Sequence, residues 1–154
     1  MPQEPFQRFL DAHRDDVWRF LVASVGRDAA DDCFQETFLA AMRAYPRMRP
    51  DNPRAWVLTI AHRKALDHFR ARKRRAVPVG DLPEVPAPED QQIRDDGVWQ
   101  RVHALPAKQR AAVLLRFAGD LTHSEVASVM GVSEEAARRN TFEGLRKLRQ
   151  EMTA

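Results

Sequence analysis

Three adjacent side chains near the C-terminus have the chemistry of a nucleic-acid reader: Arg138, Arg139 and Asn140. A guanidinium group or a side-chain amide can make paired hydrogen bonds to the edge of a base, and arginine also neutralises phosphate. Three hydroxyl residues shortly before them could contact phosphate as well: Thr122, Ser124 and Ser133. These residues predict a DNA-binding surface in the last third of the chain.

A second basic group lies in the middle of the chain, where Arg70, Arg72, Lys73, Arg74 and Arg75 fall within six positions. Cations at the C-terminus of a helix are favoured by the helix dipole whatever the function. Five cations this close also repel one another, and contact with phosphate would release condensed counterions. We therefore expect this cluster to contact nucleic acid.

The residues around the first group predict a helix-turn-helix. Thr122 and Glu125 have the spacing of a capping box, so a helix should begin near His123. Gly131 can adopt the positive φ that ends a helix, and Ser133 can cap the next one. An ordinary αα-hairpin with a solvated arginine face shares most of these signals, so this alternative stays open.

The first half of the chain predicts three further helices. Apolar residues recur at helical spacing over residues 6–25 and again over residues 28–45. Asn52 before Pro53 is a typical helix start, with asparagine as the cap and proline at the first helical position. The helix that follows should run into the basic cluster. The chain is therefore expected to be all-α.

The distribution of charge divides the chain into three parts. Residues 1–75 carry a net charge of +5 (15 basic and 10 acidic residues), and residues 99–154 carry +3 (9 basic and 6 acidic). Residues 76–98 carry −5 (1 basic and 6 acidic), are rich in proline and have few large apolar residues. We expect a flexible acidic linker over 76–98 between two small helical domains, 1–75 and 99–154.

Several function classes have no support in the sequence. It contains no H-E-x-x-H pair, no glycine-rich phosphate loop and no nucleophile elbow, so no catalytic residues and no cofactor are expected. Cys33 is the only cysteine, and Asp31, Asp32 and Glu36 suit a partner-binding face better than a metal site. No apolar run predicts membrane insertion, and no signal peptide is apparent, so a cytoplasmic location is expected.

Three segments together resemble one known family. Residues 31–39, DDCFQETFL, resemble the D-x-x-Q-E-T-F segment of bacterial sigma factors of the extracytoplasmic function (ECF) type. Residues 53–70 are similar to the next block of that family, and L-P-x-x-Q-R at 105–110 precedes its helix-turn-helix. Sigma factors of this type are alternative initiation factors of RNA polymerase.

The resemblance implies two sites in the first domain. The Q-E-T-F helix would dock on core RNA polymerase through Asp32, Gln35, Glu36, Phe38 and Leu39. The next helix and the loop before it would bind and open the minus 10 element of promoter DNA. The residues implied there are Asn52, Arg54, His62, Arg63, Lys64, Asp67, Arg70, Arg72, Lys73, Arg74 and Arg75. Arg63 departs from the family, whose members commonly have asparagine at this position.

In the second domain the resemblance implies recognition of the minus 35 element, through Thr122, Ser124, Ser133, Arg138, Arg139 and Asn140. Glu134, Glu135 and Glu143 make this helix less basic than is common in the family. Core RNA polymerase and promoter DNA are the implied partners, and an anti-sigma factor is a further one.

The sequence thus predicts an alternative sigma factor that directs promoter-specific initiation and is not itself an enzyme. Two alternatives remain open. One is a helix-turn-helix regulator that binds DNA without polymerase, although it would have no use for a polymerase-docking helix. The other is a sigma-like protein that titrates polymerase without opening promoters.

Overall fold

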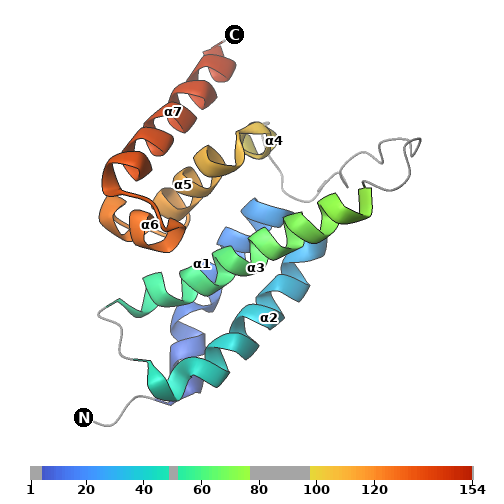
Figure 1. The fold of residues 1–154 in the computed structure, drawn as a ribbon, viewed down its shortest axis with the longest axis vertical. Helices are drawn as coiled ribbons and strands as arrows, with labels where there is room; N and C mark the ends of the chain where they lie inside the picture. The colour runs from blue at the N-terminus through green and yellow to red at the C-terminus, as the bar shows by residue number, and fades with distance from the viewer. Residues whose placement is uncertain (1–4, 49–51, 77–97, 154) are drawn as a thin grey trace.

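The structure is a computed structural model that describes residues 5–48, 52–76 and 98–153 (Figure 1). Its regular elements are all helices, as the sequence predicts. Seven α-helices and one short 3-10 turn occur in this part of the chain: α1 Phe6–Val25, α2 Arg27–Ala44, η1 Tyr45–Arg47, α3 Pro53–Ala76, α4 Val98–Ala104, α5 Ala107–Phe117, α6 His123–Met130 and α7 Glu134–Thr153. Residues 77–97, which hold most of the predicted linker, lie outside the described part.

Helices α1, α2 and α3 pack together as one module around apolar stripes at helical spacing. Its most deeply buried side chains include Phe9, Val17, Phe20, Leu21, Val57 and Leu58. Gly26, at φ 87°, separates α1 from α2, a backbone angle that few other residues adopt. The amide of Ala55 donates to the side-chain oxygen of Asn52 at 3.1 Å, which confirms the predicted cap of α3.

Helices α4 to α7 form the second module, and the predicted helix-turn-helix is α6 and α7. The amide of Glu125 donates to Thr122 Oγ1 at 3.2 Å, and the amide of Thr122 donates to Glu125 Oε1 at 2.8 Å. This pair is the expected capping box. Gly131 ends α6 at φ 69°, and Ser133 Oγ accepts from the amide of Ala136 at 3.0 Å. The turn between the two helices is therefore capped on both sides.

The two modules pack against each other, with α6 on α3 and α5 on α1 (Figure 1). Buried apolar residues from both modules form one continuous cluster. The sequence analysis predicted neither helix α4 nor this packing between the modules. Within the described ranges, no helix has both the length and the apolar character needed to cross a membrane.

Candidate functional site

The exposed face of α7 carries the arginines that sequence analysis singled out. Arg138 and Arg139 are exposed, whereas Asn140 is half-buried. Arg138 Nη2 lies 2.9 Å from Glu134 Oε1, one turn earlier on the same helix. Glu134 therefore competes with phosphate or a base for Arg138, and it lowers the positive charge of the face.

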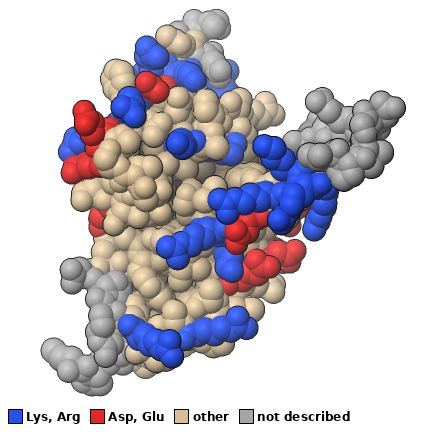
Figure 2. All heavy atoms as spheres, in the orientation of Figure 1, with Lys and Arg blue, Asp and Glu red and all other residues tan. Residues whose placement is uncertain are grey.

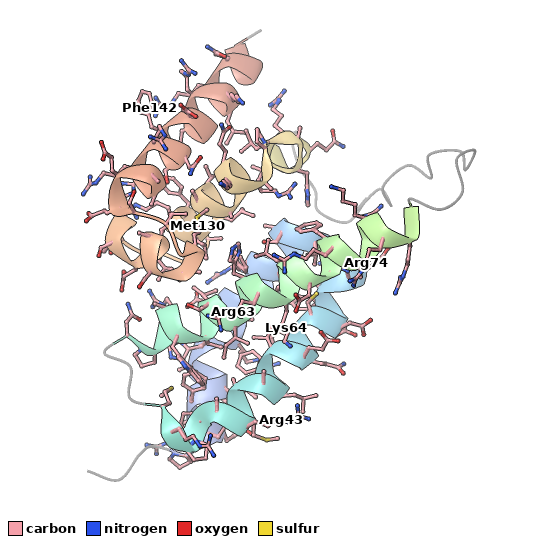
Figure 3. All side chains as sticks on the ribbon, in the orientation of Figure 1. Arg43, Arg63, Lys64, Arg74, Met130 and Phe142 are labelled. Carbon is pink, nitrogen blue, oxygen red and sulfur yellow. The ribbon has the colours of Figure 1, made fainter. Side chains whose placement is uncertain are left out.

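Phe142 lies at the centre of the same face and was missed by sequence analysis. Its side chain is 65% exposed, and it points away from α5 (Figure 3). On a helical wheel it falls between Arg138 and Arg139 and off the stripe that contains buried Ala137 and Thr141. This helical-wheel position, away from the buried stripe, is the sequence signal that could have identified Phe142 as exposed. An apolar ring here can contact the methyl group of thymine in the major groove.

Glu143, one turn after Arg139 on α7, contacts the neighbouring helix α5. It is half-buried and accepts a hydrogen bond from Gln109 Nε2 of α5 at 3.2 Å. A hydrogen bond from a neutral amide does not cancel the charge of a carboxylate, so the expectation that Glu143 makes this helix less basic stays a prediction. The hydroxyls of Thr122 and Ser133 serve as helix caps, while Ser124 is exposed near the start of α6.

Helix α3 and the residue before it hold the residues predicted for the minus 10 element, and these residues differ in how far they are exposed. Arg63 and Asp67 are exposed, and Lys64 is half-buried; Arg63 and Lys64 are labelled in Figure 3. His62 is only 8% exposed and packs edge-on against Phe20, with ring centroids 6.4 Å apart. His62 therefore departs from the predicted exposed surface, since in this arrangement it belongs to the core.

Two other residues predicted for the minus 10 element already have partners within the protein. Asn52 caps α3 with its side-chain oxygen. Arg54 Nε lies 3.2 Å from Asp16 Oδ2 of α1, and its Nη1 lies 3.5 Å from Asp120 Oδ2 in the turn between α5 and α6. The guanidinium of Arg54 thus joins the two modules.

The basic cluster at the end of α3 is solvent-exposed. Arg70, Arg72, Lys73, Arg74 and Arg75 are all exposed. Figure 2 shows a band of Lys and Arg along this helix to its C-terminal end. Burial, and then the charges of Arg72 and Arg75, lower the pKa of nearby His68. The band is a positive surface that suits the phosphate backbone of nucleic acid.

The predicted polymerase-docking patch on α2 divides into exposed and buried residues. Asp32, Gln35 and Glu36 are exposed, and Leu39 is 48% exposed. Phe38 is 6% exposed and packs on Phe34 with ring centroids 4.9 Å apart. Phe38 is thus a core residue in this structure and supports the patch from beneath, because the stripe that packs α2 on α1 and α3 includes it.

Met42 extends this patch and was missed by sequence analysis. It is 49% exposed and follows Gln35 by seven residues, so the two lie on the same face of α2. Leu39 and Met42 together give the acidic face an exposed apolar centre. Such a surface suits packing against a partner helix.

Comparison with known families accounts for both modules. The sigma-70 region 2 model matches residues 9–75, and the sigma-70 region 4 model matches residues 102–150. The ECF RNA polymerase sigma factor SigD of Mycobacterium tuberculosis is 35% identical over 94% of this chain and 76% of SigD. The chain belongs to the ECF sigma factors. It is an alternative sigma factor, and it acts with RNA polymerase in transcription initiation.

Other ECF sigma factors extend the comparison. SigC of M. tuberculosis is 35% identical over 81% of this chain and 71% of SigC. BldN of Streptomyces coelicolor is 31% identical over 94% of this chain, but the chain spans only 59% of BldN.

Among solved structures, the sigma factor RpoE from the Bartonella quintana complex with the anti-sigma factor NepR is 20% identical. It superposes with a TM-score of 0.80 over 97% of both chains. CnrH, solved with the cytosolic domain of CnrY, is 23% identical and gives a TM-score of 0.71 over 96% of this chain and 87% of CnrH. Both share the fold of this sigma factor.

Proposed function

We propose that the two modules divide the work of initiation. In this proposal residues 1–75 dock on core polymerase and open the minus 10 element, and residues 99–154 bind the minus 35 element, with 76–98 as the linker. The observation that carries the proposal is the separation of the exposed surfaces. The acidic and apolar patch lies on α2, the basic band on α3, and the arginine and phenylalanine face on α7.

The docking surface in this proposal consists of Asp32, Gln35, Glu36, Leu39 and Met42. Its carboxylates can pair with cations of a partner helix, and the exposed apolar side chains between them can fill a groove. Apolar side chains exposed next to charged ones are typical of a protein interface.

For the minus 35 element, we assign Arg138, Arg139 and Phe142 to the major groove. The arginines supply hydrogen-bond donors for base edges and phosphate, and Phe142 supplies an apolar contact. Asn140 and Ser124 are further candidates for DNA contacts at the edge of this surface. The hydroxyls of Thr122 and Ser133 cap helices through one oxygen lone pair, so each O–H can still donate a hydrogen bond to phosphate.

For the minus 10 element, the exposed residues of α3 are the main candidates: Arg63, Lys64, Asp67, Arg70, Arg72, Lys73, Arg74 and Arg75. A cationic surface along one helix can follow the backbone of a single strand. Arg54 joins this set once its contacts with Asp16 and Asp120 are released. In this proposal the protein contributes no catalytic group, and the polymerase catalyses nucleotide addition. The protein acts in the cytoplasm, where it meets the polymerase.

We also propose an anti-sigma factor as a partner. The related structure of RpoE is a complex with the anti-sigma factor NepR. A largely apolar groove between the modules supports the proposal. Val22 of α1 and Leu114 and Phe117 of α5 line it, and the charged residues of its lining are Asp16, Arg19, Arg27, Arg54 and Asp120. An amphipathic helix of a partner would fit such a groove.

The division of work can be tested with two double variants in one assay. Arg138→Ala with Arg139→Ala should abolish promoter-selective initiation and leave binding to core polymerase intact. Gln35→Ala with Glu36→Ala should weaken binding to core polymerase. Loss of polymerase binding in the arginine variant, or unchanged binding in the α2 variant, would contradict the assignment. Exposed Arg8→Ala with Arg14→Ala on α1 is a control that removes the same charge.

A further inference from the structure

Glu134 and Arg138 form an ion pair on the surface of α7 that the proposed function assigns to DNA. Arg138 Nη2 lies 2.9 Å from Glu134 Oε1, and the arginine side chain is 60% and the glutamate side chain 49% exposed. The glutamate precedes the arginine by four residues, which is the favourable order for such a pair on a helix. An exposed pair adds little to stability. What it does change is the conformational freedom of the Arg138 side chain.

The backbone beneath this pair is held in place by the core of the second module. Ala137, which lies between the two residues in sequence, is fully buried, and Thr141 is 3% exposed. Thr141 Oγ1 also donates to the carbonyl oxygen of Ala137 at 2.8 Å. Ser133 caps the helix directly before Glu134. The pair therefore projects from a fixed point in the N-terminal turns of α7, the part of a recognition helix that contacts base edges.

Arg139 provides a contrast on the same helix. Glu135 precedes it by four residues and Glu143 follows it by four, so both have the spacing of an ion pair. In the part of the chain that the structure describes, neither carboxylate lies within ion-pair distance of Arg139, and Glu143 instead accepts from Gln109 Nε2. An ion pair thus restrains only one of the two arginines on this face.

His123, at the start of α6, is the other group near the pair that could compete for the carboxylate. Burial, and then the charges of Arg138 and Arg116, lower the pKa of its imidazole, whereas Glu134 raises it. The net shift is downward from 6.5, so His123 is mostly neutral above that pH. Arg116 donates to the carbonyl oxygen of Leu121 at 3.2 Å. At neutral pH the carboxylate of Glu134 therefore has Arg138 as its cationic partner.

A guanidinium that is held at one corner still offers a pair of donors. Arginine carries five N–H groups, and Nη2 can present two parallel donors together with either Nε or Nη1. The bond to Glu134 uses one Nη2 proton, so one of these two donor pairs stays complete whichever proton is used. Two parallel donors match the O6 and N7 acceptors of guanine in the major groove. A restrained side chain also loses less conformational entropy on binding.

We propose that Glu134 is a positioning residue, which holds Arg138 in the direction that reads a guanine of the minus 35 element. The carboxylate holds one corner of the guanidinium, and the remaining pair of donors binds the base. Glu134 then increases specificity while it weakens the overall attraction to phosphate, since it adds a negative charge to the face. The proposal rests on the proposed assignment of α7 to the minus 35 element.

The test measures base preference rather than total activity. The full chain and core polymerase initiate on promoters with random bases in the minus 35 element, and sequencing of the transcribed promoters gives the preference at each position. Arg138→Ala identifies the position that Arg138 reads. There the wild type should favour guanine about tenfold over other bases, and Glu134→Gln about threefold or less. Glu134→Gln combined with Arg138→Ala should cause no further loss at that position.

Glu135→Gln is the matched control, because it removes the same charge from the same turn of α7 without breaking an ion pair. It should leave the preference at the Arg138 position unchanged. Glu134→Asp keeps a carboxylate on a shorter side chain and should retain more of the preference than Glu134→Gln. Thermal unfolding followed by circular dichroism should give similar midpoints for these variants, so that a changed preference does not reflect loss of the fold.

Four results would overturn the proposal. An unchanged preference in Glu134→Gln would show that the carboxylate only competes with DNA for Arg138. An equal loss in Glu134→Gln and Glu135→Gln would show an effect of charge alone. Relaxation at a position other than the one lost in Arg138→Ala would show that Glu134 contacts a base itself. An Arg138→Ala variant with the wild-type preference at every position would show that Arg138 reads no base.

Selection of random DNA duplexes by the free full-length chain separates this proposal from the proposed function. If the chain starts no transcripts with polymerase, the proposed function fails, but the selected duplexes still report base preference. A guanine preference that is lost in both Glu134→Gln and Arg138→Ala would support the positioning role. A preference retained in Glu134→Gln, or duplexes recovered with no sequence preference, would overturn it.

Discussion

Gly144 of α7 and Val113 of α5 lie so close that a Cβ atom added at Gly144 would be 2.7 Å from Val113 Cγ2. The added Cβ atom would also lie 3.4 Å from the carbonyl oxygen of Gln109. Val113 is buried and β-branched, so it cannot readily move away. The angle at which α7 presents Arg138, Arg139 and Phe142 therefore depends on a glycine at this crossing.

Replacing Gly144 with Val should lower the free energy of unfolding of the second module by about 1–3 kcal/mol, because the added atoms overpack the crossing. Urea unfolding followed by circular dichroism measures the change. Arg146→Val is the matched control, since it adds the same side chain at an exposed position of α7. Equal stability of the two variants would contradict the proposed close crossing.

His62 should make stability depend on pH. Burial, and then the positive charge of Arg63, lower the pKa of His62 from its ordinary value of 6.5. The unfolded chain takes up a proton near pH 6.5, whereas the folded chain does so only at lower pH. The contribution of His62 is therefore complete above pH 6.5 and is lost as the pH falls below it. The urea midpoint measured between pH 7.5 and pH 5 should fall more steeply for the wild type than for His62→Leu, and parallel curves would refute this role.

Cys33 should be protected from alkylation in the folded chain. Burial, and then the carboxylates of Glu36, Asp32 and Asp67, raise the pKa of its thiol from 9.0 to about 11. The thiolate is the reactive form, so at pH 8 iodoacetamide should react about a hundredfold more slowly than with the unfolded chain. Mass spectrometry of native and urea-treated samples measures the two rates. Similar rates would show that the thiol is accessible.

Phe142 should contribute to promoter choice and little to stability. Because its ring is 65% exposed, Phe142→Ala should leave the thermal midpoint nearly unchanged. Initiation at promoters with thymine in the minus 35 element should fall about tenfold, through loss of an apolar contact with the methyl group. Phe117→Ala, at a 57% exposed ring on α5, is the control. An equal loss of initiation in both variants would count against a specific role for Phe142.

Local signals were enough to predict most of the helices. Asn52 and Pro53, the Thr122 and Glu125 pair, and Gly131 each act on the backbone within a few residues, so their effects can be read directly from the sequence. Helix α4 was missed because it is only seven residues long and follows the acidic segment. Its place against α1 and α7 is a tertiary effect.

The sequence indicated the residue types of the candidate site, but it did not predict well which of those residues are exposed. The family resemblance placed Phe38 in the docking patch, whereas packing of α2 in the module buries it, and Met42 was overlooked because no motif includes it. His62 and Arg54 differ from expectation because they meet Phe20 and Asp120, which are distant in sequence. Contacts of this kind follow from the packing of helices and modules, and no short motif encodes them.

The central claim is tested most directly by adding the purified chain to bacterial core RNA polymerase and mapping transcript starts on genomic fragments. The account predicts that the chain co-elutes with core polymerase and that transcripts begin at defined points with a shared upstream sequence. Co-elution without new starts would contradict the account in favour of a protein that titrates polymerase. DNA binding without co-elution would contradict it in favour of an autonomous regulator.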